Sequence, residues 1–361
     1  MQLLSETAIR AVLSEYIDPL LECDLITAKV LKMVQITDQG YSLTLQFGFP
    51  LKGYTETFTQ SLTEYLKATL GQVPLKIDCE ARILPHRVQS GLKGLPQVKN
   101  MIVIASGKGG VGKSVTAVNL ACGLAQLGAA VGLLDADIYG PSQPQMLGTY
   151  QRPVAQSQQL QPIRRHGIQS MSIGYLVDQQ SAMIWRGPMI SQALQQLLYD
   201  TAWEALDYLI IDLPPGTGDV QLTLAQRVPI AAAIIVTTPQ ELALLDARRA
   251  IQMFKKVNVP ILGVIENMSY HSCSQCGQQT ELFGTGGGQM IAAEYGVKLL
   301  GHIPLMMAIR EQTDSGNPIV VAAPENKASK DYLRLSRYMA AQLSLQELAF
   351  SSKFPQIVIE A

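Results

Sequence analysis

The spacing of apolar residues changes along this chain, and the change separates a short N-terminal segment from a longer remainder. Alternating apolar and polar positions, typical of half-buried strands, occur at 41–47 and 75–83, and the turn at 38–40 predicts that the first of these pairs with 28–36 as a hairpin. Phe58, Leu62 and Leu66 recur every four residues, which predicts an amphipathic helix between the last two strands. A further helix is expected to open the chain, up to about Tyr16. These elements predict a small α+β domain at 1–85.

From about residue 101, short continuous apolar runs replace the alternation. They predict strands at 101–106, 130–134, 168–173, 207–212, 231–237, 260–265 and 298–303. Continuous runs are typical of strands buried on both faces, and stretches between them read as helices or loops. The expected fold class is therefore α/β, with a mostly parallel sheet covered by helices on both faces. We expect a linker at 86–99, this α/β domain at 100–345 and a C-terminal tail at 346–361.

Composition narrows the class of protein. The chain has 361 residues, is 47% hydrophobic and 16% charged, and has a net charge of −1, as expected of a two-domain globular protein. The balanced charge argues against a nucleic-acid-binding surface. Apolar runs stay short of the roughly 18 residues that cross a bilayer, and the N-terminus does not read as a signal peptide. We expect a cytoplasmic protein without nucleic-acid or membrane partners, in which the five cysteines stay reduced.

One glycine-rich segment predicts nucleotide binding. It matches the phosphate-loop pattern G-x-x-x-x-G-K-[ST] and consists of Gly107, Lys108, Gly109, Gly110, Val111, Gly112, Lys113 and Ser114. An apolar strand precedes it and a helical stretch follows it, which is the context this motif requires. Its backbone N–H groups and the helix N-terminus suit a diphosphate. Lys113 is expected to reach the β- and γ-phosphates, and Ser114 a magnesium ion.

Aspartates at two strand ends extend this prediction to hydrolysis. Asp135 and Asp137 follow the second strand of the α/β domain, where one would serve magnesium or its waters and the other the attacking water. Asp212 ends the fourth strand in the Walker-B arrangement, which supports the metal. Each aspartate also has a plainer interpretation, as the cap of a helix or turn. The three motifs in this order predict an enzyme that hydrolyses a nucleotide.

Lys108 has two interpretations that the loop sequence does not separate. It is either a solvated loop residue or a donor to the nucleotide of a second chain. In the second role it would act as an arginine finger does, by stabilising charge in the transition state.

Cys273 and Cys276 form a C-x-x-C pair in a polar loop. Such a pair is compatible with zinc, an iron–sulfur cluster, a redox pair or no ligand at all. Two thiolates do not fill the four cysteine positions of a zinc or [4Fe–4S] site. Two chains that contribute one pair each across a two-fold axis would do so, and Lys108 in its second role needs the same symmetry.

The motifs together resemble a known family. The loop with its additional lysine is similar to that of the deviant Walker-A ATPases, which include MinD, ParA, ArsA and the nitrogenase iron protein. The segments 135–142 and 212–219, together with the C-x-x-C pair, resemble the Mrp (ApbC) group of iron–sulfur cluster carriers. The N-terminal domain is similar to the cluster-assembly domain found in front of bacterial Mrp proteins. The P-loop resemblance covers residues 100 to about 345.

The resemblance implies roles for individual residues. Lys108 would act across a homodimer, Asp137 would lie near the attacking water and Asp212 on the metal side. Asn267, after the strand 260–265, would contact the adenine; its plainer interpretation is a capping asparagine. The implied cofactors are ATP, Mg²⁺ and an iron–sulfur cluster, expected as [4Fe–4S] and shared between two chains through Cys273 and Cys276.

The implied function is an ATPase that carries a cluster and passes it to apoproteins, with cluster-assembly proteins as further partners. The alternative is a zinc-stapled dimeric ATPase with a regulatory role, or a positioning role of the MinD or ParA kind. Membrane attachment of the MinD kind would need a basic amphipathic helix near the C-terminus, whereas the segment 350–361 has one lysine and a proline. The N-terminal domain lacks a cysteine in 47–54, so we expect it to dock partners or regulate.

Overall fold

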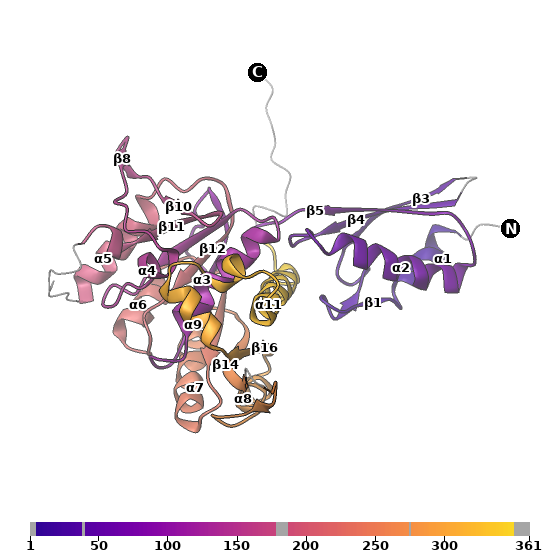
Figure 1. Cartoon of the computed structure of the whole chain (residues 1–361). Helices are drawn as coiled ribbons and strands as arrows, with labels where there is room; N and C mark the ends of the chain where they lie inside the picture. Colours follow the sequence, from indigo (N-terminus) through magenta and orange to yellow (C-terminus); the bar gives the residue numbers. More distant parts are fainter. Residues whose placement is uncertain (1–4, 38–39, 178–186, 274–275, 350–361) are drawn as a thin grey trace, which may run out of the picture. The chain divides into compact units, whose positions relative to one another are not determined.

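The computed structural model describes residues 5–37, 40–177, 187–273 and 276–349 (Figure 1). Contacts divide the chain into two compact units. The first comprises Met1–Leu84 and Arg337–Glu347, and the second comprises Pro85–Ser336 and Leu348–Ala361. The domain boundaries expected from the sequence stay a prediction, and each unit is described here by itself.

The first unit is a small three-stranded sheet with two helices. Its strands are β3 (Leu31–Thr37), β4 (Gly40–Phe47) and β5 (Leu75–Ala81), in that order, with β3 antiparallel and β5 parallel to β4. Helices α1 (Glu6–Leu13) and α2 (Thr55–Leu70) lie on one side of the sheet (Figure 1). The alternating residues of β4 place Phe47 against Phe58 of α2, with ring centroids 5.0 Å apart. A short pair, β1 (Ile17–Asp18) and β2 (Cys23–Asp24), and the C-terminal part of α11 (Lys327–Ser344) also belong to this unit.

The second unit is built on a nine-stranded sheet. Its path runs β10 (Ile163–Arg165), β11 (Ile168–Ser172), β7 (Val131–Asp135), β12 (Leu206–Asp212), β6 (Val98–Ala105), β13 (Ala232–Thr237), β14 (Ile261–Ser272) and β15 (Gln279–Thr280), and β16 (Lys298–Leu305) pairs with β14. Only the pairings of β10 with β11 and of β15 with β14 are antiparallel among the described strands of this sheet. A small pair, β8 (Ala155–Gln156) and β9 (Gln159–Leu160), lies outside it.

Strand order places the helices on both faces. The chain moves from β6 to β7 through α3 (Lys113–Gln126), and in the opposite direction from β12 to β13 through α6 (Asp219–Arg227). Because parallel crossovers are right-handed, α3 and α6 cover opposite faces. The predicted α/β class, with a mostly parallel sheet and a small α+β unit before it, is confirmed.

The remaining helices lie between the later strands or follow β16. They are α4 (Gln143–Leu147), α5 (Gly187–Tyr199), α7 (Glu241–Lys256), α8 (Gly287–Tyr295), α9 (Met307–Asp314), α10 (Ile319–Ala322) and α11 (Lys327–Ser344), with a 3₁₀ turn η1 (Ile173–Tyr175). In the described part of the chain, no helix combines the length and the apolar character that crossing a membrane requires.

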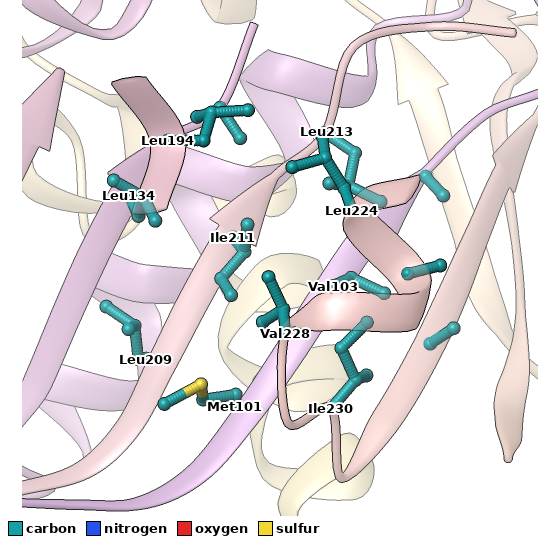
Figure 2. Packing of buried hydrophobic residues seen from close by; sticks show 14 of the residues in the cluster. Met101, Val103, Leu134, Leu194, Leu209, Ile211, Leu213, Leu224, Val228 and Ile230 are labelled. Atoms are coloured by element: carbon teal, nitrogen blue, oxygen red, sulfur yellow. The ribbon is translucent and has the colours of Figure 1, made fainter. Parts of the chain in front are cut away.

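A buried core fixes the central strands against α6 (Figure 2). This cluster contains Met101 of β6 and Leu209 and Ile211 of β12. It also contains Leu224 of α6 and Val228, the residue directly after that helix. Fully burying a side chain of this size stabilises a protein by about 1.5–3 kcal/mol. The core therefore holds β6 and β12 in a defined register, and with them the loops at their carboxyl ends.

Three strand ends meet at one point of the sheet edge. In the register, Asp212 of β12 lies opposite Ile104 of β6 and also opposite Asp135 of β7. Open parallel sheets bind ligands at the carboxyl ends of their strands, near the point where the strand order reverses. The loops after β6, β7 and β12 are therefore where a ligand site is expected.

Candidate functional site

The glycine-rich loop joins β6 to α3, as predicted from the sequence. Lys113 is the first residue of α3, and Gly112 before it has a φ of +80°, in the left-handed region that favours glycine. A Cβ on Gly112 would lie 2.1 Å from Asn267 Nδ2. A Cβ on Gly107 would meet the backbone of Asp246 in α7 at the same distance. Glycine is thus required at both positions, because a Cβ would collide with Asn267 at one and with the backbone of α7 at the other.

Lys113 connects the loop to the end of β12. Its side chain is buried and forms an ion pair with Asp212 Oδ1, which is itself fully buried. Lys113 Nζ also lies 3.0 Å from Ser114 Oγ. Lys113 therefore contacts both its neighbour Ser114 and an aspartate 99 positions further along the chain.

Asp135 lies beside Asp212 on the neighbouring strand and is also fully buried. Burial, and then the charge of Asp212, raise the pKa of Asp135 to about 7. Its Oδ2 accepts hydrogen bonds from the backbone N–H of Gln143, at 3.1 Å, and from Ser172 Oγ, at 3.0 Å. Asp135, the last residue of β7, therefore links that strand to β11 and α4 through hydrogen bonds.

Asp137 lies two residues further on, at the site's edge. Its backbone N–H donates to Asp135 Oδ1 at 3.2 Å, and its own Oδ1 accepts from the N–H of Gly140 at 3.3 Å. Burial raises its pKa; Lys113 opposes this rise and Asp212 adds to it. The charges of Lys113 and Asp212 thus act on Asp137, although Asp137 is less buried than either of them.

Gln143 belongs to the site and carries no motif signal of its own. Its Nε2 donates to Asp212 Oδ2 at 2.8 Å and to the carbonyl oxygen of Ser114 at 3.1 Å. Its Oε1 is buried and has no hydrogen-bond partner among the described residues. Leaving a buried acceptor unsatisfied costs about 1–3 kcal/mol. Ser172 is the second residue that sequence reasoning missed, since nothing in the sequence pairs β11 with β7.

Asn267 also reaches the loop. It is buried in β14, and its Nδ2 donates to the carbonyl oxygen of Val111 at 2.8 Å. The strand predicted at 260–265 continues to Ser272, so Asn267 lies within β14 rather than after it. The adenine contact assigned to it by resemblance stays a prediction.

Lys108 is half-buried in the loop. Its carbonyl oxygen accepts a hydrogen bond from Ser106 Oγ at 2.8 Å. The backbone oxygen of Ser106 accepts from the N–H of Gly216, at 2.9 Å, in the segment that follows Asp212. The backbone of the phosphate loop is thus joined to the segment after the Walker-B strand.

The cysteine pair lies at the end of the strand that carries Asn267. β14 and β15 pair at His271 and Ser272, and the N–H of Cys273 donates to the oxygen of Gln278 at 2.9 Å. The N–H of Gly277 returns to the oxygen of Cys273, also at 2.9 Å. Cys273 is half-buried and Cys276 is exposed, at the tip of a hairpin. Within the described ranges no group of three or more His, Cys, Asp or Glu side chains is arranged to hold a metal.

Fold and site together define a P-loop nucleoside triphosphatase. Residues 97–340 match the family model described as NUBPL iron-transfer P-loop NTPase. The chain is 45% identical over 343 residues to a Haemophilus influenzae protein named iron-sulfur cluster carrier protein, a match that covers 94% of this chain and 93% of that protein. The chain therefore belongs to the NUBPL iron-transfer P-loop NTPase family, and the resemblance drawn from its motifs is confirmed.

Solved structures agree with this assignment. A nucleotide-binding protein in complex with ADP from Archaeoglobus fulgidus is 37% identical, with a TM-score of 0.57, and the match covers 65% of this chain and 91% of that one. The cell division ATPase MinD of Pyrococcus furiosus is 23% identical, with a TM-score of 0.52, over 66% of this chain and 98% of its own. At that identity the likeness to MinD shows the fold alone.

Proposed function

We propose that this chain is an ATP-hydrolysing iron–sulfur cluster carrier that works as a homodimer. One observation carries the proposal: a single strand, β14, contacts the phosphate loop through Asn267 and ends directly before the half-buried Cys273, with the exposed Cys276 three residues further on. The name of the Haemophilus influenzae relative supports the cargo. Apoproteins would receive the cluster, and cluster-assembly proteins would supply it.

The loop geometry supports the part of the proposal that concerns the nucleotide. Residues 107–114 would hold the phosphates of ATP, with Lys113 leaving Asp212 for the β- and γ-phosphates. Asp137 would act near the attacking water and Asn267 near the adenine. The ADP complex of the Archaeoglobus fulgidus protein supports nucleotide binding at this fold.

Magnesium fits the donors that the site offers. Ser114 Oγ and the carboxylate of Asp212 lie together at the helix start, and Gln143 Oε1 is an unsatisfied acceptor beside them. Oxygen donors of this kind are what Mg²⁺ prefers. When bound, the ion would neutralise charge on the phosphates; Ser114 and Asp212 are the residues that would hold it.

The number of thiols supports the proposed dimer. Cys273 and Cys276 of one chain offer two thiolates, whereas a [4Fe–4S] cluster takes four. Two hairpins that meet across a two-fold axis would supply the set, and the same axis would let Lys108 reach the partner's nucleotide. Binding or hydrolysis of ATP would shift β14 between states with different hold on the cluster. Thiolates must stay reduced to bind iron, which supports a cytoplasmic location.

The cargo is tested by anaerobic reconstitution of the full chain, with iron, sulfide and zinc counted. The parent should hold four iron and four sulfide per two chains, as expected for [4Fe–4S], and Cys273→Ala and Cys276→Ala should each lose most of both. Cys79→Ala is the matched control, because that thiol belongs to β5 in the other unit and burial raises its pKa to about 11. Zinc without iron would favour the zinc-stapled regulatory ATPase instead, and iron retained in both variants would exclude the hairpin.

The nucleotide site is tested by ATP turnover. Lys113→Ala should abolish hydrolysis, because it removes the phosphate contact in the same chain. Lys108→Ala should lower turnover by at least a hundredfold and leave the affinity of a single chain for ADP unchanged. Turnover unchanged in Lys108→Ala would remove the dimer-spanning role and leave the solvated-loop interpretation.

A further inference from the structure

Gln143 links three separate parts of the nucleotide site. Its backbone N–H holds Asp135, and its side-chain amide holds both Asp212 and the carbonyl oxygen of Ser114. The residue is 1% exposed, although it lies on a five-residue helix near the surface. A long polar side chain is rarely buried so completely unless its hydrogen bonds require it.

The orientation of the Gln143 amide is fixed by its neighbours. Asp212 Oδ2 and the Ser114 oxygen are both acceptors, so the amide nitrogen must face them. The carbonyl oxygen, bonded to the same carbon, therefore lies in the immediate surroundings of Ser114 and Asp212. It is buried there without a donor in the described chain. An acceptor left unsatisfied beside two metal-side residues indicates that a donor arrives with the ligand.

We propose that Gln143 is a positioning residue of the magnesium–nucleotide site. Its Nε2 holds Asp212 in place when Lys113 turns to the phosphates, and its Oε1 accepts a hydrogen bond from a water of the metal's shell. A metal-bound water is a strong donor and suits a neutral carbonyl acceptor. This inference rests on the magnesium role proposed above, and it adds a residue that acts on the ion through Asp212 and water rather than by direct ligation.

Calorimetry of ADP binding to the full chain, with and without Mg²⁺, tests the proposal. The quantity to compare is the Mg²⁺ increment, which is the ratio of the two ADP affinities. Gln143→Met keeps the length of the side chain and removes both polar atoms. It should reduce the increment at least tenfold, because the loss in ADP affinity with Mg²⁺ should be at least ten times the loss without it. Gln145→Met, an exposed residue on the same helix, should leave the increment unchanged.

Gln143→Glu separates positioning from packing. It places a second carboxylate beside Asp212, and Mg²⁺ relieves that repulsion, so the increment should rise above that of the parent. A purely structural role would instead move the metal-free and metal-loaded affinities of both variants by the same factor, and that result would overturn the proposal. A parent chain without any Mg²⁺ increment would overturn the magnesium role itself. An increment intact in both parent and Gln143→Met would overturn only the role of Gln143.

Discussion

At the scale of single residues, the nucleotide site is defined by one lysine among three carboxylates. Lys113 pairs with Asp212, and its charge also acts on Asp135 and Asp137. Burial raises the pKa of Asp135 to about 7 and that of Asp137 above its ordinary value. Concentrated negative charge of this kind is stabilised by a cation, which supports the magnesium role proposed for the site.

The first prediction concerns this buried ion pair. Lys113→Met should destabilise the nucleotide-free chain by about 3–5 kcal/mol, because it leaves the buried Asp212 charge unpaired. The measurement is the free energy of unfolding in urea at pH 8. Lys113→Met combined with Asp212→Leu should recover more than half of the loss, since neither charge then remains. A single variant as stable as the parent would show that Asp212 does not depend on Lys113.

A second prediction concerns the pair Glu266 and His302, which braces β14 next to Asn267. Glu266 Oε1 lies 3.1 Å from His302 Nδ1, and Glu266 Oε2 accepts from the N–H of Gly288 at 2.6 Å. The hydrogen bond to Glu266 raises the pKa of His302, and burial opposes it. Burial acts to raise the pKa of Glu266, but the hydrogen bonds from His302 and Gly288 outweigh it and lower that pKa.

The two pKa shifts determine how the stability of the chain changes with pH. A raised histidine pKa gives stability that is complete below about pH 6.5 and is lost as the pH rises through the folded-state pKa. A lowered glutamate pKa gives stability that is present above about pH 4.3 and is lost on acidification. His302→Ala should therefore cost about 0.5–1 kcal/mol at pH 6, within the range of partly exposed pairs, and close to nothing at pH 9. Urea unfolding at both pH values measures this, and an equal cost at both would contradict it.

The candidate site was partly predictable at this scale. The loop residues, Asp135, Asp137 and Asp212 follow strands in the sequence, and their positions at strand ends were predicted correctly. Gln143 and Ser172 were not found, because their roles depend on which strands are neighbours. That β7 lies between β11 and β12 is a property of the sheet, and no local pattern encodes it.

At the scale of elements, β14 is the clearest difference from the sequence prediction. Its apolar run ends at Ile265, but the strand continues through buried polar residues that are satisfied by hydrogen bonds. Glu266 pairs with His302, Asn267 with Val111, and Ser269 Oγ donates to the oxygen of Glu266 at 2.8 Å. A periodicity argument ends a strand where apolar residues end. In β14, hydrogen-bond partners elsewhere in the chain stabilise the strand beyond Ile265. This extension of the strand joins the phosphate loop to the hairpin that carries the cysteines.

A third prediction tests how closely α7 packs on the phosphate loop. Gly107→Ala would place a Cβ 2.1 Å from the backbone of Asp246, and backbone atoms do not give way as the end of a side chain does. Overpacking of this kind costs about 1–3 kcal/mol, so the unfolding free energy should fall by that amount. Gly94→Ala, in the same unit and with open space around its Cβ, is the control and should stay within about 0.5 kcal/mol of the parent. Equal stability of the two variants would mean that α7 moves freely relative to the loop.

At the scale of the whole molecule, the fold class follows from the sequence because strand type is a local property. Continuous apolar runs separated by helical stretches predict a buried parallel sheet wherever they occur. The spatial order of the strands is different, since β12, fourth along the chain among the predicted strands, lies between β7 and β6. That insertion places Asp212 beside both Asp135 and the phosphate loop. The chemistry of the site thus depends on the long-range feature that periodicity does not reveal.

The last prediction concerns the assembly of two chains. Between β14 and β15, Cys276 is exposed and Cys273 is half-buried, so a four-thiolate cluster bound there would link two chains. Without nucleotide, the reconstituted chain should therefore sediment as a dimer, and iron chelation should weaken dimerisation by at least tenfold in Kd, about 1.4 kcal/mol. Cys276→Ser should sediment as a monomer whether or not iron is offered, whereas Cys79→Ser should behave as the parent. Adding ATP to the iron-free chain separates the two sources of association, because contacts made by Lys108 need nucleotide and the cluster does not. A chain that holds its full iron and sulfide as a monomer would contradict the shared cluster, and with it the geometry that joins the two halves of the proposed function.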